Sequence, residues 1–247
     1  MTDVLLEARG VAMRFGNFQA LGPIDVQFRQ GELSAIIGPN GAGKSTLFNI
    51  LSGSLAPTAG KVLFRGDDVT ALPQHAYARR GIAKSFQITN VFRQLSAHEN
   101  VRVAVQMREA RFDFLRPRAA LTSVADKAHA LLQRVGLAGA GDRTAADLAH
   151  GQQRALEIAM ALASDPQLLL LDEPTAGMSP EETRVMMDLI AELATERTVI
   201  LVEHKMKMVM GLCRRLLVLH HGELLAEGTP HEIRANDTVR RVYLGQG

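Results

Sequence analysis

The sequence predicts an α/β fold built on a mainly parallel sheet, and three regions of the chain carry that prediction. Residues 1–36 alternate apolar and polar positions, as in short strands with turns at Gly16-Asn17 and Gln30-Gly31. From about 88 to 165 helical spacing replaces the strand signals. From residue 167 onward apolar strands alternate with helices, which is typical of a parallel sheet. We expect a single domain, 1–247, with a core of about 1–87 and 166–247 and an inserted helical subdomain of about 88–165.

Composition excludes several classes of protein. The 28 Lys and Arg residues nearly balance the 26 Asp and Glu residues, so nothing favours a nucleic-acid partner. The single cysteine, Cys213, cannot form an internal disulfide, and we expect it to be a buried apolar residue. There is no signal-peptide pattern at the N-terminus, and no apolar run approaches the roughly 18 residues that span a bilayer. The chain is therefore expected in the cytosol unless partners hold it at a membrane.

Residues 38–46, GPNGAGKST, match the phosphate-binding pattern G-x-x-x-x-G-K-[ST]. The apolar strand ELSAIIG precedes them, and GKSTLFNILSG follows with helical spacing. Glycines let successive N–H groups point inward at a phosphate, and the helix N-terminus adds a positive dipole. Lys44 is expected to reach the β- and γ-phosphates and Ser45 to bind Mg²⁺. The alternative is a purely structural turn. The expected nucleotide-binding set in this loop is Gly38, Asn40, Gly41, Ala42, Gly43, Lys44, Ser45 and Thr46.

A second motif, LLLLDEP at residues 168–174, is an apolar strand that ends in two carboxylates. Open α/β sheets bind ligands beyond the carboxyl ends of their strands. Asp172 would hold Mg²⁺ through water, and Glu173 would polarise an attacking water. The alternative is an acidic pair at a helix N-terminus. Together the two motifs fit many nucleotide hydrolases and kinases.

The stretch DLAHGQQRALEIAMAL, residues 147–162, distinguishes among these classes. Its apolar residues have helical spacing, yet it opens on His150-Gly151-Gln152, and glycine costs a helix about 1 kcal/mol against alanine. LAHGQQR, followed closely by LLLLDEP, resembles the signature motif of ABC ATPases, usually written LSGGQ. The resemblance covers essentially the whole chain. It extends to Phe15 in MRFGN, Gln87 in SFQIT, Ser179 in AGMSP and His204 in LVEHK.

The resemblance implies a P-loop NTPase (RecA-like) core with an N-terminal antiparallel β-subdomain and an inserted helical subdomain. It implies that two ATPase domains meet head to tail and enclose ATP and Mg²⁺. Phe15 would stack on adenine. The catalytic residues would be Glu173, His204, Gln87 and Lys44. The residues that bind Mg²⁺ would be Ser45, Gln87 and Asp172. The signature residues, which would face the partner's γ-phosphate, are Leu148, Ala149, His150, Gly151 and Gln152.

The chain departs from the family pattern at three positions. Ala149 replaces a serine, which removes a phosphate hydrogen bond worth on the order of 1.5–3 kcal/mol if it goes to a charged group. His150 replaces a glycine, and it either substitutes in part for that bond or is simply solvated. Ser179 replaces the aspartate of the D-loop. A weakened half-site would suit a heterodimer with two unequal ATP sites.

The variant signature and the tail EGTPHEIRANDTVRRVYLGQG resemble the LivG-type ATPases of branched-chain amino acid importers. This implies a second ATPase subunit, integral permease subunits that contact residues 88–100, and an external solute-binding protein that acts indirectly. The chain would lie on the inner face of the cell membrane. The alternatives are a lipopolysaccharide-type exporter and importers of urea, amides or aromatic acids. One domain and no heptad repeats argue against soluble ABC proteins of translation or repair, and the signature and His204 argue against a P-loop kinase.

Overall fold

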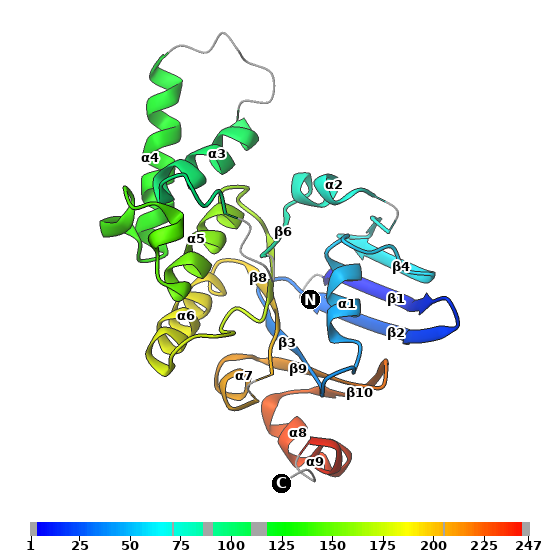
Figure 1. The fold of residues 1–247 in the computed structure, drawn as a ribbon. Helices are drawn as coiled ribbons and strands as arrows, with labels where there is room; N and C mark the ends of the chain where they lie inside the picture. Colours follow the sequence, from blue (N-terminus) through cyan, green and yellow to red (C-terminus); the bar gives the residue numbers. More distant parts are fainter. Residues whose placement is uncertain (1–3, 71, 86–90, 110–117, 205, 244–247) are drawn as a thin grey trace.

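The computed structural model describes residues 4–70, 72–85, 91–109, 118–204 and 206–243, which fold around two β-sheets (Figure 1). The antiparallel sheet has the order β2-β1-β4-β5, and the larger sheet has the order β10-β9-β3-β8-β7-β6. In the larger sheet only β9 and β10 pair antiparallel. The strands are β1 (Val4–Phe15), β2 (Phe18–Arg29), β3 (Leu33–Ile37), β4 (Ala59–Phe64), β5 (Asp67–Asp68), β6 (Ile82–Lys84), β7 (Leu168–Asp172), β8 (Thr198–Val202), β9 (Arg215–His220) and β10 (Glu223–Gly228). The predicted fold class is confirmed.

The central strands are apolar at almost every position because both faces of the parallel sheet are covered. On β7, Leu168 and Leu170 pack into one core, whereas Leu169 and Leu171 pack into the other. The first core also contains helix α1 (Lys44–Leu51) and the inner face of the antiparallel sheet. The second core lies against the remaining large helices. A strand buried on both faces reads as a continuous apolar run, which is how LLLLD appears in the sequence.

Apart from α1 and the short helix α2 (Gln74–Arg79), the helices fall into two groups in Figure 1. One group crosses the second face of the large sheet or its end: α6 (Pro180–Leu193), α7 (Met206–Leu212), α8 (Pro230–Ala235) and α9 (Asp237–Tyr243). The other extends away from the sheet at the upper left: α3 (Ala97–Glu109), α4 (Arg118–Arg134) and α5 (His150–Leu162), with short 3-10 turns at Ala138–Ala140 and Ala145–Asp147. No strand of a sheet occurs between Lys84 and Leu168 in the described ranges, as the helical spacing predicts.

Asn100 organises the start of the helical group. Its side chain is fully buried, and its Oδ1 accepts the Phe92 N–H at 2.7 Å. Its Nδ2 donates to the carbonyl oxygens of Phe92 at 3.0 Å and Ser96 at 2.9 Å. One amide thus folds the segment before α3 back onto the helix. Sequence patterning did not single out this residue, because a buried asparagine has no periodic signal.

Several short elements were not predicted, including β6, α2 and the C-terminal helices α8 and α9. Strand β6 has three residues, which is too short for an alternation pattern to be recognised. Helix α2 (Gln74–Arg79) has six residues and packs Tyr77 into the first core. Helix α4 also begins earlier than its apolar spacing suggested, at Arg118. The two β-turns at Gly16-Asn17 and Gln30-Gly31 and the buried Cys213 are confirmed.

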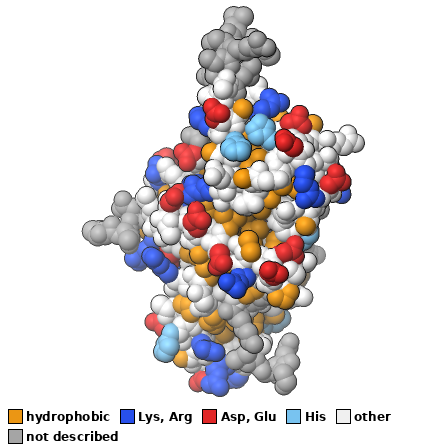
Figure 2. Space-filling model, turned by 90° about the vertical axis from the view of Figure 1, so that its left-hand side faces the viewer, with side chains coloured by type: hydrophobic (Ala, Val, Ile, Leu, Met, Phe, Trp, Pro, Cys, Tyr) orange, Lys and Arg blue, Asp and Glu red, His pale blue; other side chains and the backbone are white. Residues whose placement is uncertain are grey.

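The face that carries α4, α5 and α6 has a hydrophobic groove. Figure 2 shows hydrophobic side chains gathered in the middle of this face, with charged side chains on both sides. The groove encloses about 510 Å³ between the end of α4, the start of α5 and one side of α6. Val185 contributes the most exposed hydrophobic side chain here, at 66% of its full accessibility.

Candidate nucleotide-binding and hydrolysis site

The P-loop connects the end of β3 to the start of α1. Lys44 is only 5% exposed, and its Nζ donates to the carbonyl oxygens of Gly38 at 2.8 Å and Pro39 at 2.9 Å. The ammonium therefore lies inside the curl of the loop, where a phosphate chain would bind. Ser45, the next residue, is exposed. These positions agree with the predicted roles of both residues, which stay predictions.

Two glycines of the loop have no room for a side chain. A Cβ on Gly38 would lie 2.3 Å from the Leu219 carbonyl oxygen of β9. Gly43 has φ +95°, and its Cβ would lie 3.0 Å from the Ala20 carbonyl oxygen of β2. Backbone at this left-handed φ favours glycine. Both neighbouring strands therefore hold the loop closely, which fixes its curled backbone before any ligand arrives.

Asp172 ends β7 as a buried carboxylate, 4% exposed, and its Oδ1 has no hydrogen-bond partner in the described part of the chain. Burial raises the pKa of Asp172, while the nearby Lys84 ammonium opposes that rise. Burial likewise lowers the pKa of Lys44, and the charges of Glu173 and Asp172 oppose that fall. An orphaned carboxylate oxygen close to the P-loop lysine is what an oxygen-preferring divalent cation would satisfy.

Glu173 and His204 lie against each other at the carboxyl ends of β7 and β8. Nε2 of His204 contacts Oε1 of Glu173, and because a carboxylate only accepts, Nε2 carries the proton. Glu173 is held in the left-handed region, at φ 45°, with its N–H bonded to the Val202 carbonyl at 2.9 Å. Such backbone strain in a non-glycine residue is concentrated at functional sites. The structure brings these two predicted catalytic residues together.

Glu203 supports this pair, and sequence reasoning missed it. The carboxylate is 3% exposed and accepts from the Thr175 hydroxyl at 2.5 Å and from the His204 N–H at 3.1 Å. It therefore connects the segment after Glu173 to the backbone of His204. Its position at the carboxyl end of an apolar strand was the available signal, since Asp172 and Glu173 were recognised by the same rule.

Phe15 ends β1 and is 50% exposed. It pairs across the hairpin with Phe18, which is 68% exposed, so two aromatic rings are presented at one tip. The hairpin returns through β2, whose Ala20 and Leu21 meet Gly43 of the P-loop. An exposed ring on the hairpin whose second strand meets the phosphate-binding loop suits the adenine-stacking role predicted for Phe15. Gln87 and the adjoining residues 88–90 of the expected permease contact lie outside the described residues.

The signature residues surround the first turn of α5. Leu148 is buried, whereas Ala149 and His150 are exposed. The Gln152 amide oxygen accepts the Ala149 N–H at 3.1 Å. Ala149 is the N-cap residue, and a residue three positions along the chain bonds its N–H in this way in a capping box. The hydrogen bonds of residues 148–152 in the described chain stay within α5 or go to Ala176 and Glu182. None of them goes to residues 38–46.

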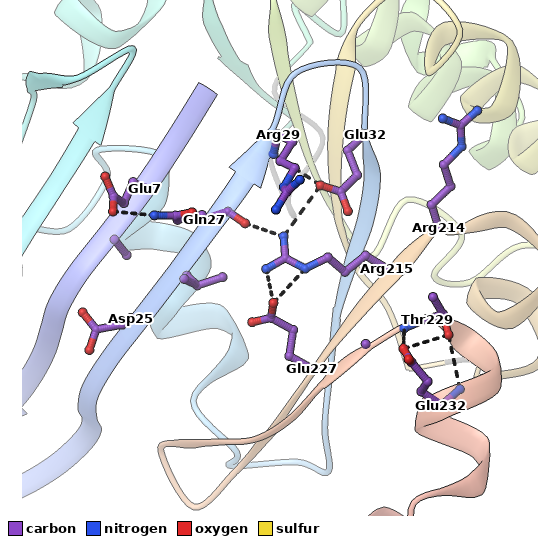
Figure 3. Close-up of a pocket in the computed structure, with 13 residues that line it drawn as sticks. Glu7, Asp25, Gln27, Arg29, Glu32, Arg214, Arg215, Glu227, Thr229 and Glu232 are labelled. Atoms are coloured by element: carbon purple, nitrogen blue, oxygen red, sulfur yellow. Dashed lines mark hydrogen bonds and ion pairs between the residues drawn. The ribbon is translucent and has the colours of Figure 1, made fainter. Parts of the chain in front are cut away.

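A separate hollow of about 570 Å³ lies between the antiparallel sheet and β9–β10, and Figure 3 shows its charged lining. Arg215 of β9 reaches across it. Its guanidinium bonds to Glu227 of β10, to the Gln27 carbonyl of β2, and at 3.6 Å to Glu32. Arg214 points away from this cluster (Figure 3). The arginine is already satisfied by the protein, so the hollow is a junction between the two sheets.

Replacing Arg215 by alanine is expected to lower the free energy of unfolding by about 2–4 kcal/mol, because it leaves Glu227 and the Gln27 carbonyl without their charged donor. Urea denaturation followed by circular dichroism measures the loss. Arg214→Ala, at the exposed neighbouring position, is the matched control and should change stability by less than about 0.5 kcal/mol. Equal effects of the two substitutions would show that Arg215 does not join the sheets.

Comparison with known families shows which protein family the chain belongs to. Residues 21–176 match the family model described as ABC transporter. The chain is an ABC transporter ATPase. Residues 223–247 of this ABC ATPase match a second model, described as branched-chain amino acid ATP-binding cassette transporter.

Several proteins resemble this ABC ATPase over nearly their whole length. The high-affinity branched-chain amino acid transport ATP-binding protein LivG of Escherichia coli K12 is 41% identical over 100% of both chains. BraF of Pseudomonas aeruginosa, with the same description, is 39% identical over 100% of both chains. The lipopolysaccharide export system ATP-binding protein LptB of Escherichia coli K12 is 32% identical over 98% of this chain and 97% of its own.

Solved structures of other cassettes agree with the fold. The ADP conformation of MJ1267, an ATP-binding cassette of an ABC transporter, superposes with a TM-score of 0.85 at 26% identity, covering 98% of this chain and 99% of its own. A dimeric post-hydrolysis state of the cassette MJ0796 bound to ADP and Pi gives 0.79 at 25% identity, covering 92% and 99%. This ABC ATPase therefore has the fold of nucleotide-binding cassettes that dimerise. No helix in its described ranges is long and apolar enough to cross a membrane.

Proposed function

We propose that this ABC ATPase powers the import of branched-chain amino acids, or of closely related amino acids, through partner permease subunits. The observation that carries the proposal is the full-length identity of 41% to a protein described as a branched-chain amino acid transport ATP-binding protein. The match of residues 223–247 to a branched-chain amino acid transporter model agrees with it. The solute does not touch this subunit, so the choice of solute rests on these likenesses and not on the site.

The proposed catalytic unit is a pair of ATPase subunits, each of which binds nucleotide on its own P-loop. Lys44 and the loop 38–46 hold the phosphates, and Phe15 stacks on the base. Ser45, Asp172 and Gln87 would hold Mg²⁺, which would neutralise charge on the β- and γ-phosphates. The orphaned Oδ1 of Asp172 supports this assignment. Signature residues 148–152 complete the site on the neighbouring subunit, and two identical or two different subunits are both compatible with the proposal.

Hydrolysis in this scheme depends on positioning and charge. Glu173 polarises the attacking water, and His204 orients the water and the γ-phosphate. Glu203 would fix the backbone on which His204 sits. In the described conformation His204 and Glu173 already contact each other, so both groups are in place beside the position where the water would bind. Preorganised groups of this kind act without rearranging in the transition state, which lowers the barrier.

Coupling to the membrane would pass through the helical subdomain, about 88–165, moving against the core of about 1–87 and 166–247. The proposed docking surface for a permease helix consists of residues 88–100. Asn100 organises its described part, residues 91–100. The subunit would work on the cytoplasmic side of the membrane. An external solute-binding protein would deliver the solute to the permease and act on the ATPase only indirectly.

Transport by the reconstituted assembly tests the proposal. The chain should co-purify with permease subunits encoded alongside it, and vesicles containing them should take up labelled leucine, isoleucine or valine when ATP and the binding protein are present. Uptake of urea, amides or aromatic acids in place of these solutes would move the chain to another importer branch. ATP-driven release of lipopolysaccharide would support the second candidate, which the likeness to LptB favours, and would end the import proposal.

A further inference from the structure

The start of the signature helix is bonded to the D-loop segment, residues 176–180, of its own chain. His150 Nε2 lies 3.0 Å from the Ala176 carbonyl oxygen. One residue further, the Gly151 N–H donates to Glu182 Oε1 at 3.3 Å. The other oxygen of Glu182 accepts the Ser179 N–H at 2.9 Å. The His150 imidazole of α5 thus bonds to the D-loop segment, and the Glu182 carboxylate of α6 bonds to the start of α5.

The chemistry of the His150 contact fixes its direction. A carbonyl oxygen can only accept, so Nε2 of His150 must carry the proton. A neutral ring is then in the Nε2–H tautomer, and this nitrogen has no lone pair for another donor. The exposed ring is therefore not merely solvated. Nε2 is committed to the protein, and a phosphate contact would have to replace the bond to Ala176.

The glycines on both sides of the contact leave room for it. Gly177 has φ +74°, and a Cβ there would lie 3.3 Å from His150 Nε2. A Cβ on Gly151 would lie 2.9 Å from Glu182 Oε1. Side chains at either position would press on the two connecting groups. The fit of the backbone around both contacts shows that they belong to one packed arrangement.

Ser179, which stands where the family pattern has an aspartate, helps to build the same arrangement. Its hydroxyl accepts the Glu182 N–H at 3.2 Å, while Glu182 returns the bond to the Ser179 N–H. Hydrogen bonding from Ser179 lowers the pKa of Glu182, with a smaller contribution from the nearby His150. The carboxylate therefore stays charged and available to Gly151.

We propose that His150 is a positioning residue that holds the D-loop segment in register with the signature helix of the same chain. The proposal rests on the proposed function, in which both elements meet the nucleotide bound by the neighbouring subunit. Connected in this way, they reach that nucleotide as one unit. The contact between His150 and Ala176 lies beside two positions at which this chain departs from the family pattern. Ala149 replaces the signature serine, and Ser179 replaces the D-loop aspartate.

The tautomer gives a direct spectroscopic test. Nitrogen NMR of ¹⁵N-histidine-labelled protein, assigned by comparison with His150→Gln, should show the His150 ring as Nε2–H with a detectable hydrogen-bonded proton. The exposed His129 of α4 serves as the internal reference for a solvated ring. An Nδ1–H ring, or a His150 signal that matches His129, would overturn the proposed contact.

Kinetics test its consequence in the full-length ATPase. His150→Ala should lower kcat about tenfold, leave KM for ATP within about twofold, and leave the affinity of a single chain for a fluorescent ATP analogue unchanged. His150→Gln retains a side-chain N–H donor that can reach the Ala176 carbonyl, so it should recover kcat to within about threefold of wild type. His129→Ala is the matched control on the same group of helices and should behave as wild type.

Two results would overturn the proposal. One is a kcat for His150→Ala equal to that of His129→Ala. The other is a His150→Gln variant as slow as His150→Ala, because the bond to Ala176 would then not be what matters. Failure of the proposed function would look different, since the wild-type protein itself would then not hydrolyse ATP as a pair or not drive amino-acid uptake, whereas the two results above concern the His150 variants alone.

Discussion

Glu173→Gln is expected to reduce ATP turnover by at least about 100-fold while ATP still binds, because the amide cannot take the proton of the attacking water. The substitution preserves size and leaves an amide oxygen that can still accept from His204 Nε2. The ATPase pair should therefore stay closed on its nucleotide. Steady-state hydrolysis measures the loss, and gel filtration in ATP and Mg²⁺ measures the nucleotide that remains bound.

The matched control is Glu192→Gln, the same change on the exposed side of α6. It should hydrolyse ATP as the wild type does. Wild-type turnover in Glu173→Gln would assign the base to another group, and the first to examine would be Glu203, whose carboxylate lies beside His204.

Lys44→Ala is expected to weaken ATP binding by about 100-fold or more, which corresponds to roughly 2.7 kcal/mol. The alanine removes the buried ammonium that lies within the curl of the P-loop, so the β- and γ-phosphates lose their charge-assisted hydrogen bonds. Equilibrium binding of a fluorescent ATP analogue measures the change.

Lys61→Ala is the control for Lys44→Ala, because Lys61 is 66% exposed and pairs only weakly with Asp68 across 3.4 Å. Circular dichroism should show that both variants are folded. An affinity of Lys44→Ala within about threefold of wild type would contradict the assignment of the P-loop.

The parts of this structure that could be predicted from the sequence are those with a regular residue pattern. Strand β7 was predicted because both of its faces are buried, and the P-loop because its glycines are spaced for a curled backbone. Asp172 and Glu173 were found because they end an apolar strand, whereas His204 came from the resemblance to ABC ATPases, and the structure places Glu173 and His204 in contact. Six-residue and three-residue elements such as α2 and β6 have no periodicity to detect.

Residues that act through a single tertiary contact were harder to predict. Glu203 and Arg215 bond to segments that are distant in the sequence. Asn100 bonds to a nearby loop that has no sequence pattern. His150 was expected either to bind phosphate or to be solvated, and it does a third thing: it bonds to Ala176, 26 residues away. No spacing rule relates those two positions, because the contact exists only once α5 and α6 are packed.

The structure of the Glu173→Gln ATPase pair bound to ATP and Mg²⁺ tests the central claim most directly. The account predicts that each γ-phosphate contacts Lys44, or its counterpart, in one subunit and Gly151 and Gln152, or their counterparts, in the other. A γ-phosphate that is contacted by a single subunit, with residues 148–152 directed away from nucleotide in every copy, would contradict it.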